Sequence, residues 1–248
     1  MKKIILVTLF VALFLSAPIN PSYGLKHKRH LLLVGATAYR SLIELYPTND
    51  INVTYLGYGS DFPNTLKELK QYDVIMFANI DTHGFNPHLS NDEMKNIMKF
   101  VEEGGTFIMA GGYGSFGGYN DSINYPDVVG YDETPIEKIL PVEILHPNDT
   151  YWRDFVPQVL KKHFLTNGIF KHHPTMHGLN LVKAKEDSIV LADDGDGHPF
   201  LVIGKYKKGR VLAFTSDIGP GWGSEYIFWK HAEEFWHRVM IWATDKKF

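Results

Sequence analysis

The alternation of short apolar runs with segments of helical periodicity is the feature that most constrains the fold of this chain. Short runs suited to buried strands occur at residues 30–35, 51–56, 73–78 and 106–110. Between them, residues 62–71 and 94–103 have the apolar spacing of amphipathic helices. An alternation of strand and helix is typical of an α/β fold with a doubly wound, mostly parallel sheet.

Helix boundary signals support this assignment. Ser90 and Glu93 have the spacing of a capping box in front of the segment 94–103. Asn64 or Thr65 is the candidate N-cap of the segment 62–71. We therefore expect both helices to begin at these polar residues.

The C-terminal half has a different pattern. Apolar runs at residues 189–192, 199–206 and 210–216 are separated by short turns that contain glycine. Such turns between apolar runs predict antiparallel hairpins added to the parallel sheet. Residues 224–243 predict a closing helix with Phe228 and Trp229 on its packed face, whereas residues 120–177 predict an irregular, loop-rich insertion with one short helix at 135–140.

The N-terminus resembles a secretory signal. Two lysines precede the apolar run 4–15, which is short for a membrane span. Small residues allow cleavage after Gly24 or after Ala17, and an uncleaved anchor is the alternative. We expect a signal peptide at residues 1–24 and a single domain at 25–248 that is secreted or periplasmic, with no stable membrane span after signal removal.

Composition narrows the function. The chain has no cysteine, which excludes disulfides, thiolate metal sites and a cysteine nucleophile. Its formal net charge is -3, so nucleic acid is not an expected partner. No cofactor and no metal site are predicted, and the oligomeric state is left open, with a homo-oligomer among the alternatives.

A glycine-rich turn follows the apolar run 106–110 and is the predicted location of a site. It contains Gly112, Tyr113, Gly114, Ser115 and Phe116. Glycine lets the backbone approach a ligand closely, and ligands of open α/β sheets bind at the carboxyl ends of strands.

Ser115 is the candidate nucleophile of this turn. Residues 113–117 are close to the Gly-x-Ser-x-Gly elbow of hydrolases, although a tyrosine occupies the first glycine position. His83 and Asp217, each just after a predicted strand, are the candidate partners. The alternative is that Ser115 is a turn residue whose hydroxyl bonds the local backbone.

Other polar residues are expected at the same edge of the sheet. Asp81, Glu143 and Asp217 with His83 could perform acid/base chemistry or bind a metal through oxygen and nitrogen ligands, but the favoured interpretation is the solvated rim of a pocket. Trp222 with Tyr113, Phe116 and Tyr119 could present flat surfaces to a sugar or another small polar ligand, or pack the glycine turn.

Two further clusters resemble metal sites only superficially. The run 193–197 resembles the start of a calcium loop but lacks the later ligands, which favours a tight acidic hairpin. His172, His173 and His177 are interpreted as surface loop residues.

Three segments together resemble a known family. Residues 62–73, residues 104–118 with 134–143, and residues 209–222 are similar to the glutamine amidotransferase-like family, a branch of the class I glutamine amidotransferase-like superfamily. The similarity extends over residues 31–242. It implies a flavodoxin-like fold in which the long loops and hairpins are family additions.

The resemblance also implies which chemistry is missing. Active members of the superfamily carry a cysteine in a strand-to-helix elbow, followed by a histidine and a glutamate. This chain has no cysteine, and residues 217–222 stand where a His-Pro-Glu motif would be expected. We therefore expect a binding or interaction module for a small ligand, carbohydrates included, without glutaminase activity. The alternative is a hydrolase that uses Ser115 with His83 and Asp217, or a carboxylate pair such as Asp81 and Asp217. A third possibility is a purely structural domain that binds a partner.

Overall fold

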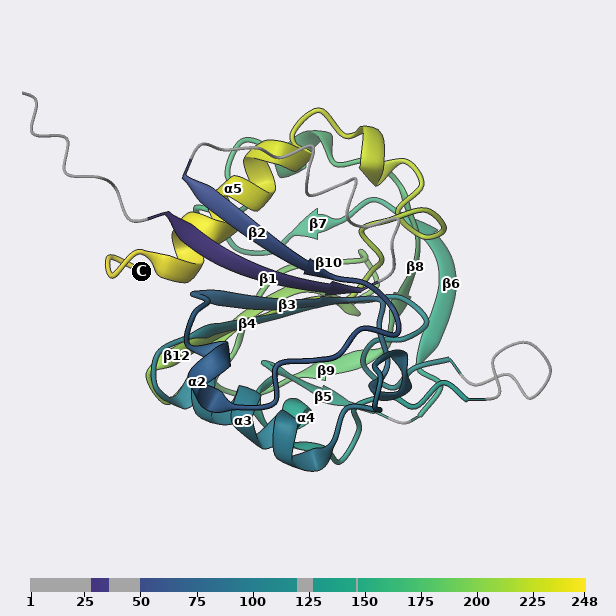
Figure 1. Ribbon diagram of the computed structural model, residues 1–248. Helices are drawn as coiled ribbons and strands as arrows, with labels where there is room; N and C mark the ends of the chain where they lie inside the picture. Colours follow the sequence, from purple (N-terminus) through teal and green to yellow (C-terminus); the bar gives the residue numbers. More distant parts are fainter. Residues whose placement is uncertain (1–27, 36–49, 120–126, 146) are drawn as a thin grey trace, which may run out of the picture.

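An eight-stranded mixed sheet forms the centre of the molecule. The computed structural model describes residues 28–35, 50–119, 127–145 and 147–248. The predicted signal segment, residues 1–24, lies outside them. The strand order is β2-β1-β3-β4-β12-β11-β10-β7 (Figure 1). The strands of this sheet are β1 (Arg29–Gly35), β2 (Ile51–Leu56), β3 (Val74–Ala78), β4 (Thr106–Ala110), β7 (Gln158–Val159), β10 (Ile189–Asp193), β11 (Pro199–Tyr206) and β12 (Gly209–Phe214).

The sheet has a parallel half and an antiparallel half. Neighbouring strands from β2 to β12 are parallel, and those from β12 to β7 are antiparallel. The parallel part has the order 2-1-3-4-5 of flavodoxin-like sheets. The predicted α/β class is confirmed, as are the hairpins of the C-terminal half.

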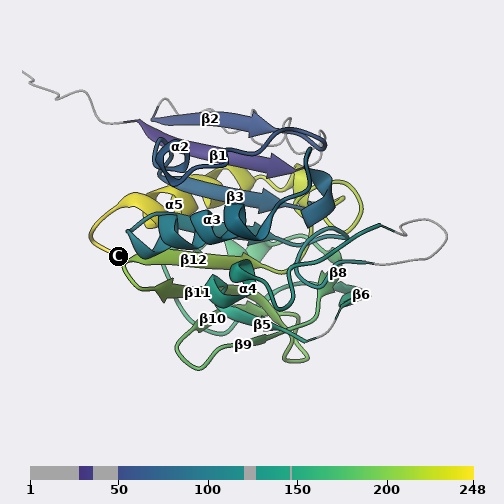
Figure 2. The same cartoon turned by 60° about the horizontal axis from the view of Figure 1, so that its bottom comes forward.

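Helices lie on both faces of the sheet. Figures 1 and 2 show α2, α3 and α4 on one face and α5 on the other. Each face has its own apolar core, in which Ile97 and Phe107 belong to one and Phe214 and Phe235 to the other. The helices are α2 (Leu66–Leu69), α3 (Asn91–Glu102), α4 (Pro135–Ile139) and α5 (Ala232–Thr244), with short 3-10 turns η1 (Thr82–Gly84), η2 (Phe170–His172) and η3 (Tyr226–Phe228).

A capping box begins each of α2 and α3. The box at Ser90 was predicted, whereas the cap of α2 is Thr65, one of the two predicted candidates, and α2 is shorter than the predicted segment 62–71. The Ser90 hydroxyl accepts from the Glu93 amide, and the Glu93 carboxylate accepts from the Ser90 amide. Thr65 and Glu68 make the same reciprocal pair. Because these bonds satisfy amides that the first helical turn leaves unpaired, they fix both helix starts.

The segment 120–177, predicted as loops with one short helix, contains additional strands. The helix is α4, whereas β5 (Val142–Ile144) pairs with β9 (Val182–Ala184), and β6 (Thr150–Phe155) pairs with β8 (Met176–Asn180). The prediction was wrong for these strands. In β6, three of the six residues are exposed and one is buried, so this strand lacks the apolar alternation of a half-buried strand. What holds β6 in place is its backbone pairing with β8.

The closing helix begins later than predicted. α5 starts at Ala232, and the preceding residues form η3 and an extended residue, Trp229, with φ -68° and ψ 118°. Trp229 turns its side chain into the core, whereas Phe228, predicted on the packed face, is 84% exposed. Among the described residues, no helix is both long enough and apolar enough to cross a membrane.

Candidate functional site

The glycine-rich turn after β4 is held tightly against the end of β3. Gly112 has φ 127°, and a Cβ there would lie 2.5 Å from the side chain of Asn79. A Cβ on Gly114 would lie 2.8 Å from the backbone nitrogen of Asp81. Asn79 itself has φ 48°, and its Oδ1 accepts from the Gly114 amide at 2.8 Å. Glycine is therefore required at both positions by the close approach of two chain segments.

A buried amide fixes the other side of the turn. Asn180, at the end of β8, is fully buried, and its Oδ1 accepts from the Gly112 amide at 2.9 Å. Its Nδ2 donates to Asp149 Oδ1 at 2.7 Å and to the carbonyls of Gly112 and Ser115. The second carboxylate oxygen of Asp149 accepts from the Gly117 amide at 2.9 Å. Buried polar groups paired in this way make the turn rigid.

A cavity of about 100 Å³ opens at the carboxyl ends of β4 and β12. The β6–β8 ribbon stands beside this edge of the sheet (Figure 1). Such a volume accommodates several waters or part of a small ligand. The cavity is lined by Asn79, Gly112, Tyr113, Trp152, Asp217, Pro220, Gly221 and Trp222.

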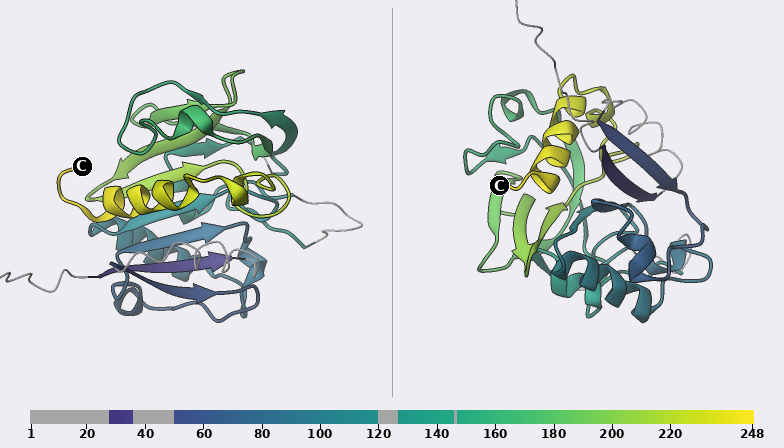
Figure 3. Two further views of the ribbon diagram at one scale, coloured as in Figure 1. Left: turned by 90° about the horizontal axis from the view of Figure 1, so that it is seen from above. Right: turned by 60° about the vertical axis from the view of Figure 1, so that its left-hand side comes forward.

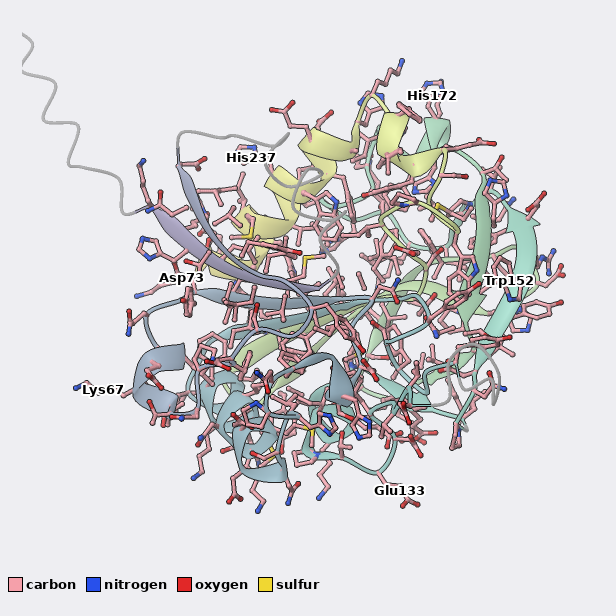
Figure 4. The ribbon with its side chains drawn as sticks, turned by 45° about the vertical axis from the view of Figure 1, so that its right-hand side comes forward. Lys67, Asp73, Glu133, Trp152, His172 and His237 are labelled. Atoms are coloured by element: carbon pink, nitrogen blue, oxygen red, sulfur yellow. The ribbon has the colours of Figure 1, made fainter. Side chains whose placement is uncertain are left out.

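Three aromatic rings meet at this cavity. The rings of Tyr113 and Trp222 are 5.7 Å apart at 88°, and those of Trp152 and Trp222 are 5.7 Å apart at 89°. Trp222 is buried, and its indole Nε1 has no hydrogen-bond partner among the described residues. Trp152 is 57% exposed and lies at the outer rim, on β6 (Figure 4). The site thus has a buried aromatic wall and an exposed one.

Asp217 is the charged group of the cavity. It follows β12, is 5% exposed, and its Oδ1 accepts from the Gly219 amide at 2.8 Å. A carboxylate has up to four acceptor positions, so it can bond the local backbone and a ligand donor together.

The position of Ser115 does not suit a nucleophile. Its side chain is fully buried, and its hydroxyl donates to the Ala110 carbonyl at 2.6 Å. This is the backbone-bonded turn residue that the sequence offered as the alternative. Ser115 does not line the cavity.

Asp81 and His83 form a separate group after β3. Asp81 accepts from the Val129 amide at 3.1 Å and from the Tyr58 hydroxyl at 3.5 Å. Burial raises the pKa of Asp81 above its usual value, and burial together with Asp81 raises the pKa of Tyr58. The His83 ring stacks on His88 at 4.1 Å. Neither Asp81 nor His83 is part of the cavity lining.

The remaining predicted residues lie apart from the cavity. Glu143 is on β5 and forms an ion pair with Lys183 at 3.1 Å. Phe116 is fully buried, with φ 54°, and its carbonyl accepts from the Tyr131 amide. Gly114 supports the turn through Asn79. Of the predicted site residues, Gly112, Tyr113, Asp217 and Trp222 come together around the cavity.

Sequence reasoning did not identify Asn79, Asn180, Asp149 or Trp152. Asn79 directly follows the apolar run 74–78, a position that could have drawn attention. The other three belong to the segments that were assigned to loops or assigned no element. Their contribution depends on the β6–β8 pairing, which carries no local sequence signal.

The acidic and histidine clusters have structural roles. Asp194 accepts from the amides of Asp196 and His198 and pairs with Arg153 at 3.2 Å, which forms the predicted acidic hairpin between β10 and β11. Among the described residues, no group of three histidine or acidic side chains could hold a metal. The interpretation of His173 as a surface residue was wrong, because it is 5% exposed and packs on Trp229.

The parallel sheet with a glycine elbow after β4 defines an amidotransferase-like α/β domain, and comparison with known proteins gives its family. A family model described as "putative glutamine amidotransferase" matches residues 36–245, so the chain belongs to this family. No curated protein matches the chain significantly.

Solved structures share the fold. Cytoplasmic Protein STM1381 from Salmonella typhimurium LT2 is 28% identical with a TM-score of 0.75, and the match covers 87% of this chain and 100% of that chain. Cytoplasmic Protein STM3548 from Salmonella typhimurium is 23% identical, also at 0.75, over 87% and 99% of the two chains. A ThuA-like protein from Bacteroides uniformis ATCC 8492 is 13% identical at 0.56, over 93% and 96%.

Proposed function

We propose that this protein is an exported member of the family that binds a small polar ligand, of the carbohydrate class, in the cavity at the carboxyl ends of β4 and β12. The observation that carries the proposal is the combination of Tyr113, Trp152 and Trp222 with the Asp217 carboxylate around one opening. Aromatic walls with few polar groups are typical of small-ligand sites.

Carbohydrate chemistry fits both parts of this arrangement. A sugar ring has an apolar face that can pack on the exposed indole of Trp152, and hydroxyls that can donate to Asp217. Hydrogen bonds to a charged acceptor are stronger than those between neutral groups.

Glutaminase activity is not part of the proposed function. The thiolate route needs a cysteine nucleophile, and the chain contains none. Incubation of the full chain with glutamine should release no ammonia above the buffer background. Ammonia release that scales with protein concentration would contradict this part of the proposal.

Hydrolysis by Ser115 is the weaker alternative. Its hydroxyl is buried and donates to the Ala110 carbonyl, an arrangement that favours a structural role. A serine-directed fluorophosphonate probe should therefore leave Ser115 unlabelled. Labelling that disappears in Ser115→Ala would favour the hydrolase instead.

Export is the third part of the proposal. It rests on the two lysines and the apolar run 4–15 near the N-terminus. Cell fractionation combined with an intact mass of the mature protein tests it. Retention of the complete N-terminus in the cytosolic fraction would contradict it.

Ligand binding is tested by titrating the full chain with glucose, galactose, mannose and N-acetylglucosamine. Saturation-transfer NMR reports binding, and tryptophan fluorescence reports the environment of Trp152 and Trp222. Trp152→Ala should weaken the affinity about tenfold, or about 1.4 kcal/mol. Phe228→Ala, which removes an 84% exposed ring away from the cavity, is the matched control. Absence of saturable binding to every sugar, or equal affinities of the two variants, would overturn the proposal.

A further inference from the structure

The β6–β8 ribbon carries Trp152, the exposed ring at the opening of the ligand cavity, and lies outside the central sheet. Among the described residues, β6 pairs with no strand other than β8. Figure 3 shows the ribbon in teal near the green strands of the antiparallel half, away from the purple and blue strands β1 and β2. A two-stranded ribbon is only marginally stable by itself, so side-chain contacts must help to hold the outer strand, β6.

A β-bulge interrupts β6 directly after Trp152. Trp152 pairs with Gly178 and Phe155 pairs with Met176, so two residues of β6 face a single residue of β8 between these pairs. The two residues are Arg153 and Asp154. A bulge bends its strand and redirects the neighbouring side chains. The direction of Trp152 therefore depends on how the two bulged residues are held.

Arg153 forms ion pairs with the acidic hairpin, residues 193–197, which joins β10 to β11. Its Nη1 lies 3.2 Å from Asp194 Oδ2 and also pairs with Asp196. The Asp194 side chain is fully buried, whereas that of Arg153 is 26% exposed. Ion pairs that are partly buried are screened by salt much less than surface pairs. This contact is therefore stronger than an ordinary surface salt bridge.

The acidic hairpin is itself held by hydrogen bonds. Asp194 Oδ1 accepts from the amides of Asp196 at 2.9 Å and His198 at 3.0 Å. His198 Nδ1 lies 2.8 Å from Asp194 Oδ2. Because the buried carboxylate is fixed by its own hairpin, it gives Arg153 a partner whose position is well defined.

The side chains of β6 contact two different parts of the molecule. Tyr151 packs edge-on against the His198 ring at 5.6 Å, on the side of the acidic hairpin. Trp152, the next residue, contacts the Trp222 ring at 5.7 Å, on the side of the cavity. Neighbouring residues of a strand point to opposite faces, which explains this division. β6 thus lies between the acidic hairpin and the aromatic wall of the cavity.

We propose that Arg153 is a positioning residue, whose ion pairs with Asp194 and Asp196 hold β6 so that Trp152 stays at the cavity opening. Its effect on sugar binding rests on the proposed function, whereas the position of Trp152 can be measured without a ligand. Arg153 is not part of the cavity lining. When the ion pairs are lost, Trp152 becomes more mobile, and a sugar must restrict that motion in order to bind, which lowers its affinity.

The first experiment needs no ligand. The emission of Trp152 is the difference between a protein and the same protein with Trp152→Phe. In Arg153→Gln, acrylamide should quench this emission about twofold more strongly than in the native chain, because a released indole is more mobile. Arg238→Gln is the matched control, since Arg238 is 20% exposed and pairs with Glu234 on α5, and it should leave the quenching unchanged. Native quenching in Arg153→Gln would overturn the proposal.

The second experiment is a double-mutant cycle with glucose, galactose, mannose and N-acetylglucosamine. Arg153→Gln should weaken the affinity about fivefold in the native chain and less than about twofold in Trp152→Ala, because its effect passes through Trp152. Equal losses in the two backgrounds would overturn the proposal. If none of the sugars binds the native chain, the proposed function fails, and the quenching result still decides the role of Arg153.

Two further variants separate positioning from folding, which far-UV circular dichroism monitors. Arg153→Lys keeps a positive charge, and because Nη1 alone makes both ion pairs, it should recover about half of the native quenching and affinity. Asp196→Lys changes a 60% exposed side chain, repels Arg153 and should raise the quenching of Trp152. Folded Arg153→Lys that behaves like Arg153→Gln, or native quenching in Asp196→Lys, would overturn the proposal.

Discussion

Two buried regions at the same end of the molecule are held together by different interactions. The elbow network joins Asn180, Asp149 and the glycine turn through hydrogen bonds. The aromatic cluster beside η3 places His173 among Phe170, Phe200, Tyr226 and Trp229, with ring separations between 4.6 and 5.6 Å. One region is specified by donors and acceptors, and the other by packing.

The polar atoms of the two regions show the difference. The Asn180 amide uses both its oxygen and its nitrogen, whereas His173 Nε2 and Trp229 Nε1 are buried without a hydrogen-bond partner among the described residues. His173 Nδ1 bonds the Pro174 carbonyl at 2.8 Å. Loss of a polar group should therefore be costly in the elbow network and nearly neutral in the aromatic cluster.

Asn180→Ala should have the largest effect. It removes the amide that joins the Gly112 backbone to Asp149 and leaves a buried carboxylate poorly paired, so we expect a loss of about 4 kcal/mol in the free energy of unfolding. Urea denaturation at pH 7 measures it. Asn96→Ala, which removes a more exposed amide bonded to the Asn64 carbonyl, should cost less than about 1 kcal/mol. Similar losses for the two variants would remove the distinction between the regions.

The aromatic cluster should instead respond to acid. Burial lowers the pKa of His173 from 6.5 to about 4. Between these values the unfolded chain binds a proton that the folded chain does not, so stability falls as the pH drops from about 6.5 to about 4. The integrated loss is about 3 kcal/mol.

His173→Phe isolates this contribution. The variant should lose that part of the pH dependence while staying within about 1 kcal/mol of the native protein at pH 7. His172→Phe, at the exposed neighbouring position, is the control and should keep the native slope. An unchanged slope in His173→Phe would show that another group governs acid sensitivity.

Gly178→Ala tests how far the region around the glycine turn depends on close packing against Trp222. A Cβ on Gly178 would lie 2.6 Å from Trp222 Nε1, so the indole must move, at a cost of about 2 kcal/mol. Trp222 emission should shift at the same time. Gly57→Ala, where the nearest atom is the Tyr55 hydroxyl at 3.3 Å, is the matched control. A stable Gly178→Ala with native emission would show that the Trp222 wall is adaptable.

The contrast also explains what the sequence could predict. β1, β3 and β4 were found because strands buried on both faces are continuous apolar runs, and α3 because Ser90 and Glu93 form its cap. These signals are local. The predicted location of the candidate site also followed from them, since the end of β4 must lie at the carboxyl edge.

The elbow network could not be found this way. Asn180 reaches Gly112 across 68 positions of sequence, through the pairing of β8 with the exposed β6. Likewise, His173 is buried by Trp229, which belongs to a segment predicted as regular helix. A polar residue in an irregular segment has no local pattern that separates a buried structural role from an exposed one.

Apart from the control variants, Ser90→Ala should have the smallest effect, and it sets the scale for the others. It removes two exposed hydrogen bonds of the Ser90 hydroxyl, one accepted from the Glu93 amide and one donated to the Glu93 carboxylate, outside both regions, and should cost about 1 kcal/mol. Ser90→Thr, which keeps the acceptor, should cost much less in the same urea experiment. Asn180→Ala removes four buried hydrogen bonds, one of them to a carboxylate, so a loss for Ser90→Ala as large as that for Asn180→Ala would contradict the greater cost expected of the buried bonds.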